Sequence, residues 1–118
     1  MRIYLLSLLV LIFLSCKTTS KAQNKSNSPL EDITWLKELK TSFEKDSGQR
    51  KAMIIQYTYN KETVFLIENC FQCPDGMSTV YNSKKKVICE FGGIIGKNTC
   101  PDFSEKATNE KVIYKSFE

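Results

Sequence analysis

The stretch AMIIQYTYN, residues Ala52–Asn60, decides the fold class of this chain. Apolar and polar residues alternate along it with a period of two, the pattern of a β-strand whose two faces meet different surroundings. One face would present four apolar or aromatic side chains, Met53, Ile55, Tyr57 and Tyr59. The other would present Ile54, Gln56 and Thr58. The stretch therefore predicts a strand in a sheet with an apolar face that another layer must cover.

Four further segments have the same character. They are TVFLIEN (63–69), STVYN (78–82), KVICEF (86–91) and KVIYKSF (111–117). Short polar connections at Asn60–Glu62 and Asn82–Lys85 separate neighbours in this series. Consecutive short strands joined by tight turns predict a small antiparallel sheet of four to five strands.

A helix pattern precedes the strands. Ser28 is a favourable N-cap, Pro29 suits the first helical position, and Glu31 completes a capping box. An apolar stripe then recurs at spacings of three and four, at Ile33, Leu36, Leu39 and Phe43. Gly48 provides a stop. The sequence predicts one N-terminal amphipathic helix over about residues 30–46, packed on the sheet in a disulfide-stapled α+β domain.

The N-terminus has the pattern of an export signal. Met1-Arg2 is followed by the apolar run Ile3–Leu14, which is shorter than the roughly 20 residues that a spanning helix needs. FLSC, ending at Cys16, resembles a bacterial lipobox. That resemblance implies cleavage after Ser15 and a diacylglyceryl thioether with acyl chains such as palmitate on Cys16. The alternative is an ordinary secretory signal cut further on, but no A-x-A-like site follows.

These signals divide the chain into three parts. Residues 1–15 form the predicted lipoprotein signal peptide, 16–28 the lipidated cysteine and a flexible tether, and 29–118 a single small domain. The tether would reach roughly 20 Å. We expect the protein to be lipid-anchored in a bacterial cell envelope, at the outer membrane rather than the inner.

Four cysteines follow the anchor: Cys70, Cys73, Cys89 and Cys100. An even number in an exported chain predicts disulfides, because the compartment is oxidising. Each bridge in so small a domain is typically worth about 2–4 kcal/mol. Four cysteines allow three pairings, and their spacing does not choose among them.

Several kinds of chemistry are disfavoured by the sequence. The chain has no histidine, which excludes Ser-His-Asp and Cys-His catalysis. CFQC (Cys70–Cys73) runs into a turn at Pro74 and not into the helix that thioredoxin-like redox sites use. Cys89 and Cys100 are too far apart to complete a zinc knuckle, and GGIIGK (92–97) is a residue short of a phosphate loop. We expect neither an enzyme nor a metal or cofactor site.

The charge balance bears on partners. There are 17 basic and 13 acidic residues, for a net charge of +4, which is too weak to predict nucleic-acid binding. The basic run Lys84–Lys86 fits a solvated turn, with contact to anionic lipid or glycan as the alternative. The expected partners are membrane lipid, through Cys16, and a protein of the envelope.

A long loop separates Phe91 from Lys111 and contains the candidate binding residues Gly93, Ile94, Ile95 and Lys97. The favoured hypothesis is a non-catalytic binding or structural module of unknown ligand. The alternative is an inhibitor-like module that presents the Gly92–Asn98 loop to a hydrolase, since a constrained loop has a lower ordering cost on binding. Exposure of Ile94 and Ile95 at a loop tip would keep the alternative, and burial would remove it.

The chain also resembles a family of small exported bacterial lipoproteins with no assigned function. The resemblance rests on Trp35-Leu36, Tyr57 with Tyr59, the pair Cys70 and Cys73, VYNSKKKVIC (80–89), Gly-Gly-Ile-x-Gly-Lys (92–97) and CPDF (100–103). Members tend to have adjacent cysteines at the first site, which rarely bond each other, whereas two residues intervene here. Combined with the greater entropic effect of longer closed loops, the resemblance implies forward pairing, with Cys73–Cys89 and Cys70–Cys100 ahead of the crossed choice.

Overall fold

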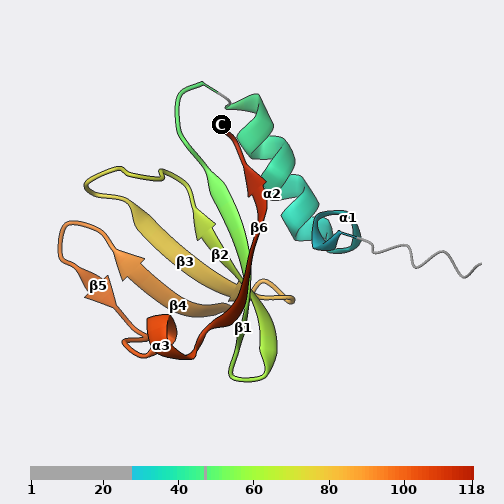
Figure 1. The fold of residues 1–118 in the computed structure, drawn as a ribbon. Helices are drawn as coiled ribbons and strands as arrows, with labels where there is room; N and C mark the ends of the chain where they lie inside the picture. The colour runs from blue at the N-terminus through green and yellow to red at the C-terminus, as the bar shows by residue number, and fades with distance from the viewer. Residues whose placement is uncertain (1–27, 47) are drawn as a thin grey trace, which may run out of the picture.

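The computed structural model describes residues 28–46 and 48–118, so the predicted signal peptide, Cys16 and the tether lie outside the described residues. Six antiparallel strands form one sheet in the order β5-β4-β3-β2-β1-β6 (Figure 1). The strands are β1 (Met53–Tyr59), β2 (Glu62–Glu68), β3 (Met77–Asn82), β4 (Val87–Gly92), β5 (Lys97–Asn98) and β6 (Thr108–Lys115). The helices are α1 (Pro29–Asp32), α2 (Thr34–Lys45) and α3 (Phe103–Lys106). None of these helices is long and apolar enough to cross a membrane.

Tight turns set the register of the sheet. Asn60 and Lys61 both have positive φ, 49° and 66°, and link β1 to β2 with Tyr59 opposite Glu62. Two such residues form the mirror-image turn that matches the twist of a hairpin. At the β3–β4 turn, Oδ1 of Asn82 accepts hydrogen bonds from the backbone N–H groups of Lys84 and Lys86. Both connections are therefore determined by local chemistry.

One face of the sheet packs on α1 and α2. Its core contains Leu30, Leu36, Ile54, Phe65 and Ile67, and Leu36, Ile54 and Phe65 are completely buried. Trp35 packs edge-on against Phe65 and donates a hydrogen bond from Nε1 to the backbone oxygen of Ser83, 2.9 Å away. The helices are thus tied both to the sheet and to the β3–β4 turn.

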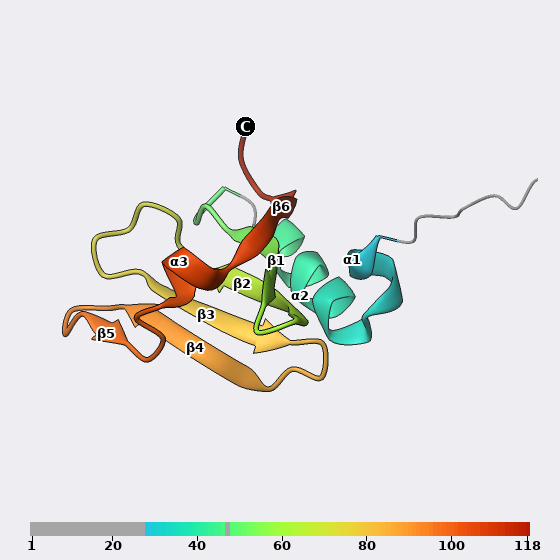
Figure 2. The same ribbon diagram turned by 60° about the horizontal axis from the view of Figure 1, so that its bottom comes forward.

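The opposite face has a core of its own. The buried residues there include Ile55, Tyr59, Leu66, Val80 and Cys89, with Phe103 of α3 packed over them. Met53 and Tyr57 also lie against this cluster, so the alternation predicted for Ala52–Asn60 is confirmed. The second cover, α3 and its flanking segments, was not predicted. Figure 2 shows α3 on the side of the sheet away from α2.

The prediction of one continuous N-terminal helix is wrong. Ile33 has extended backbone angles, φ −101° and ψ 106°, and divides α1 from α2. In an unbroken helix Leu30 and Leu36 would point about 120° apart, whereas the break lets both enter one core. The side chain of Ser28 caps no backbone group, so the predicted capping box is not formed.

The strand count also differs from the predicted four to five. β5 and α3 lie inside the segment predicted to be a long loop, and β6 begins at Thr108 instead of Lys111. β5 has only two residues, paired with Phe91 and Gly92. Such a short element leaves no periodicity in the sequence, because its existence depends on the neighbouring strand.

Candidate binding surface

A narrow hairpin projects from the sheet at β4 and β5. Its turn, Gly93–Gly96, is closed by a hydrogen bond from the N–H of Gly96 to the oxygen of Gly93, 3.1 Å long. Ile94 and Ile95 occupy the two central positions and are 86% and 87% exposed. Gly92, Gly93 and Gly96 have φ values of 91°, 75° and 63°, which glycine adopts without strain. Two large apolar side chains are therefore presented to solvent on a tight turn.

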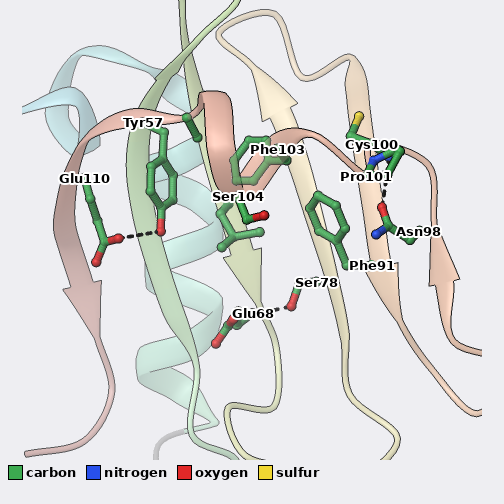
Figure 3. Close-up of a pocket in the computed structure, with 12 residues that line it drawn as sticks. Tyr57, Glu68, Ser78, Phe91, Asn98, Cys100, Pro101, Phe103, Ser104 and Glu110 are labelled. Carbon is green, nitrogen blue, oxygen red and sulfur yellow. Dashed lines mark hydrogen bonds between the residues drawn. The ribbon is translucent and has the colours of Figure 1, made fainter.

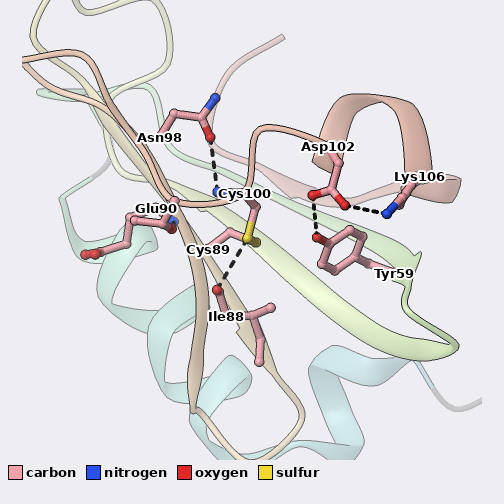
Figure 4. The surroundings of a disulfide bond; sticks show 9 residues. Tyr59, Ile88, Cys89, Glu90, Asn98, Cys100, Asp102 and Lys106 are labelled. Atoms are coloured by element: carbon pink, nitrogen blue, oxygen red, sulfur yellow. Dashed lines mark hydrogen bonds and ion pairs between the residues drawn. A yellow bond between two sulfur atoms is a disulfide. The ribbon is translucent and has the colours of Figure 1, made fainter.

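The base of this hairpin is fixed by several bonds (Figure 4). Cys89 and Cys100 form a disulfide, with Cα atoms 5.5 Å apart. The N–H of Glu90 donates to Thr99 Oγ1 at 2.9 Å, and the N–H of Thr99 donates back to the oxygen of Glu90 at 3.1 Å. Lys97 forms an ion pair with Glu90. The predicted candidate Lys97 thus helps hold the hairpin together and does not stand free at its tip.

The predicted disulfide pairing is wrong. Cys70 bonds Cys73, with Cα atoms 5.4 Å apart, and Cys89 bonds Cys100. The reason is geometric: Cys70 and Cys73 sit in one turn, where the N–H of Cys73 donates to the oxygen of Cys70. Loop-closure entropy belongs to the unfolded chain and does not decide which sulfurs the folded sheet brings together.

Cys70 and Cys73 form a disulfide within a C-x-x-C sequence, as the cysteines of redox enzymes do, but the surrounding structure differs from that of a redox site. Thioredoxin-like sites lower the thiol pKa at the start of a helix. Here the described segment from Cys70 to Met77 contains no helix and leads directly into β3. The arrangement is that of a stapled turn.

This stapled turn lies beside the hairpin. The N–H of Gly93 donates to the oxygen of Gly76 at 3.0 Å, and the side chain of Met77 lies against Gly93. Met77 is 37% exposed. We call Met77, Ile94 and Ile95 the apolar tip. Met77 is the first residue of β3, just after the Cys70–Cys73 turn, and Ile94 and Ile95 belong to the β4–β5 turn between Cys89 and Cys100.

A groove of about 470 Å³ lies on the sheet face opposite α2 (Figure 3). Three aromatic rings line it, those of Tyr57, Phe91 and Phe103. The ring of Phe103 is central, with its centroid 5.4 Å from that of Tyr57 and 5.4 Å from that of Phe91. The β4–β5 hairpin forms part of the groove wall, because its paired residues Phe91 and Asn98 both line the groove.

Two carboxylates border the same groove. Glu110 Oε2 accepts a hydrogen bond from the hydroxyl of Tyr57 at 3.0 Å, and Glu68 Oε1 accepts one from Ser78 Oγ at 3.4 Å. Burial, followed by the bond and charge of Glu110 and the charge of Glu68, raises the pKa of Tyr57 to about 12. Tyr57 is therefore a neutral hydrogen-bond donor at physiological pH.

A polar clamp fixes α3 over the second core. Asp102 Oδ2 lies 2.7 Å from Lys106 Nζ, and Asp102 Oδ1 accepts a bond from Tyr59 at 2.9 Å (Figure 4). Lys106 first, and Tyr59 next, lower the pKa of the Asp102 carboxyl, while Asp102 raises the pKa values of both partners. This clamp orients Phe103, the ring at the centre of the groove.

The structure brings some predicted residues together and adds others. Gly93, Ile94 and Ile95 do form a presented loop. Glu68 and Glu110 were not singled out from the sequence, because they are 42 positions apart. The available signal was periodicity, since Glu68 is in phase with the buried Val64 and Leu66. Within residues 28–46 and 48–118, no group of three or more His, Cys, Asp or Glu side chains could hold a metal ion.

Residues 40–116 match a protein family described as "Domain of unknown function (DUF6970)". This match covers more than half of the chain. The chain belongs to that family. The DUF6970 region contains all six strands and both disulfides, and therefore also the hairpin and the groove. No curated protein and no solved structure matches the chain. The lipoprotein character inferred from the sequence stays a prediction.

Proposed function

We propose that this DUF6970 protein is a lipid-anchored, non-catalytic module of the bacterial cell envelope that binds another envelope protein through its apolar tip. The supporting observation is the exposure of Ile94 and Ile95, 86% and 87%, on a cross-linked hairpin. Turns usually hold Gly, Asn, Asp, Ser or Pro, so two isoleucines at the central positions are not explained by turn chemistry.

The energetics point the same way. Fully burying one isoleucine side chain is worth about 1.5–3 kcal/mol, and the two at the tip gain little of this in the free domain. Single exposed apolar residues are common on protein surfaces, but contiguous apolar patches mark interaction sites. Met77, which is 37% exposed, lies against Gly93, the residue that precedes this pair. The disulfide and the Glu90–Thr99 bonds hold the hairpin in advance, which lowers the ordering cost of binding.

The position of the tip favours a protein partner over the lipid bilayer. α1, where the described part of the chain begins, lies at the opposite end of the domain from the β4–β5 turn in both views (Figures 1 and 2). A lipid on Cys16 would join the domain at the α1 end. The apolar tip would then point away from the anchored end and toward other envelope components.

The inhibitor-like alternative uses the same loop. Its requirement that Ile94 and Ile95 be exposed is met. A loop that occupies a protease cleft as a substrate does is extended, whereas Gly93–Gly96 is a closed four-residue turn. The narrow turn fits better into an apolar pocket on a partner's surface, so we favour the general binding module.

Site-specific photocrosslinking in the native envelope tests this proposal. A photoreactive phenylalanine analogue at Ile95 should yield one discrete protein adduct. The matched control places the same analogue at Lys84, an exposed position on the β3–β4 turn, and should yield no such adduct. Replacing Ile94 with Ser in the Ile95-labelled protein should weaken the adduct band severalfold, because half of the apolar pair is lost.

Each outcome of this experiment decides something. An adduct formed only with lipid, or no adduct at position 95, would contradict the protein-binding function. Equal adducts from positions 95 and 84 would show non-specific proximity and contradict it as well. Identification of the adduct as a hydrolase that the purified protein inhibits would establish the inhibitor-like alternative instead.

A further inference from the structure

The charge of the groove differs from that of the whole chain. The chain has 17 basic and 13 acidic residues, yet the charged residues that line the groove are Glu68 and Glu110, and no lysine or arginine of the described residues lines it. Within residues 28–46 and 48–118, neither carboxylate forms an ion pair. The groove therefore has an uncompensated negative charge in an otherwise basic protein.

The aromatic lining fits the same kind of ligand. The faces of aromatic rings attract cations placed within about 6 Å of the ring centroid, and the attraction is stronger where water is excluded. Three rings line the groove, and that of Phe103 lies between those of Tyr57 and Phe91. A ligand with an apolar stem and a cationic head would meet rings along its stem and a carboxylate beside its head.

The hydrogen bonds leave room for such a head group. Glu110 Oε2 accepts a hydrogen bond from the Tyr57 hydroxyl, and Glu68 Oε1 accepts one from Ser78 Oγ. The other oxygen of each carboxylate has no hydrogen-bond partner among the described residues. An anionic ligand would face two like charges. A neutral apolar ligand would remove both carboxylates from water without a counter-charge, which is costly. A cation avoids both penalties.

We propose that the groove binds the cationic side chain of an arginine or lysine on the protein that contacts the apolar tip. That the side chain comes from a protein rests on the proposed function; the preference for a cation rests on the groove alone. The two surfaces are continuous, because Phe91 and Asn98 line the groove and belong to the hairpin that ends in Ile94 and Ile95. A partner that receives the tip would bring its neighbouring residues over the groove.

A titration with blocked amino acids tests the cation preference. The oxidised full-length chain in detergent micelles is titrated with N-acetyl-arginine amide, and the amide signals of Tyr57 and Phe91 are followed by NMR. The neutral isostere N-acetyl-citrulline amide is the matched control ligand. Saturable shifts should appear with the arginine compound, and affinity for the citrulline compound should be about tenfold lower, as expected for loss of one charge-assisted bond.

Variants assign the effect to the groove. Glu68→Gln and Glu110→Gln should each weaken arginine binding about tenfold, and Phe91→Leu about threefold through loss of the ring face. Glu38→Gln, an exposed carboxylate on α2 across the sheet, should leave binding unchanged and serves as the charge control. Retained dispersion of the amide spectrum shows that each variant is folded. The comparison of the arginine and citrulline compounds uses the unsubstituted protein, so it does not depend on the folding of any variant.

The outcomes separate this inference from the proposed function. Ile94→Ser with Ile95→Ser should abolish the protein adduct but leave arginine binding intact. Equal affinity for the arginine and citrulline compounds, no saturable shift, or no effect of either glutamate substitution would overturn the inference, even if the tip adduct forms. Tighter binding of a free diamine such as putrescine would overturn the assignment to a protein side chain.

Discussion

Tyr57 contacts both the aromatic and the acidic lining of the groove. Its ring packs edge-on against Phe103, while its hydroxyl donates to Glu110. Burial is the largest cause of its raised pKa, and the neighbouring carboxylates Glu110 and Glu68 add to it. The two carboxylates that add to this shift would also stabilise a cation in the groove, because their negative charge opposes the phenolate and attracts a positive group.

The pKa of Tyr57 should respond to the removal of one of these charges. Glu110→Gln should lower it from about 12, but leave it above the ordinary value near 10, because burial of the ring is unchanged. The measurement is a pH titration of the tyrosine Cζ signal by NMR. Glu38→Gln, on the other side of the sheet, should not move it. A Tyr57 pKa that stays near 12 in Glu110→Gln would contradict the assigned cause.

The raised pKa of Tyr57 also makes the free energy of unfolding depend on pH. The unfolded tyrosine loses its proton near pH 10, whereas the folded one keeps it until about pH 12. The contribution of Tyr57 to the free energy of unfolding is therefore complete below pH 10 and is lost as the pH rises toward 12.

At the scale of elements, the β4–β5 hairpin depends on two glycines in different surroundings. Gly92 and Gly96 both have positive φ, 91° and 63°. A Cβ atom on Gly92 would collide with the backbone oxygen of Gly76, whereas one on Gly96 would meet nothing within 4 Å. Gly92 is needed for the close approach of the two loops, and Gly96 only for the shape of the turn.

Alanine substitution should separate these two roles. Gly96→Ala should cost about 1 kcal/mol, the strain of a left-handed alanine. Gly92→Ala should cost about 3 kcal/mol, because steric overlap with the neighbouring backbone is added to the strain. Urea unfolding followed by circular dichroism measures both. Equal losses of stability would show that Gly76 and Gly92 do not approach each other as the structure has them.

The two disulfides should also contribute unequally. The Cys89–Cys100 bridge spans 11 positions and should contribute about 3 kcal/mol, while the Cys70–Cys73 bridge spans three and should contribute about two-thirds as much. Double alanine variants of each pair, compared by urea unfolding, test this. Because Cys89 is fully buried, its replacement by Ala also leaves a small cavity, which lowers the stability of the Cys89/Cys100 variant further. A greater loss from the Cys70/Cys73 variant would contradict the ranking.

At the scale of the whole molecule, the two faces of the sheet are covered unequally. α1 and α2 close one face, and α3 covers only part of the other. The groove remains beside α3, and the β4–β5 turn lies at the end of the domain far from α1. This arrangement suits a module held at one end and bound to a partner at the other.

The predicted anchor has its own test. Replacing Cys16 with Ala should release the protein from membranes or leave its signal peptide uncleaved, because the lipid could no longer be attached. The measurement is fractionation of membranes with and without detergent, with the apparent mass read by electrophoresis. Ser20→Ala, four residues after Cys16 in the predicted tether, is the control and should leave the protein in the membrane fraction. Unchanged membrane association of the Cys16 variant at the apparent mass of the processed protein would refute lipidation.

Prediction from sequence succeeded where the signal was local. The alternation in Ala52–Asn60 located β1 and both of its faces, and turn residues located the hairpins at Asn60 and Asn82. It failed where a residue's environment depends on distant parts of the chain. The break at Ile33 and the strand β5 both arise from packing on neighbours that the local pattern does not contain.

The sequence by itself determined that five segments are strands, that the sheet is antiparallel, and that the Gly92–Asn98 segment is a candidate loop. These features follow from backbone geometry, which alternation and turn residues report directly. Only the tertiary structure decided the cysteine pairing, the exposure of Ile94 and Ile95, and the placement of Glu68 and Glu110 along one groove. The physical reason is that strand order places β6 beside β1 and β1 beside β2, and that order depends on packing between residues far apart in the chain.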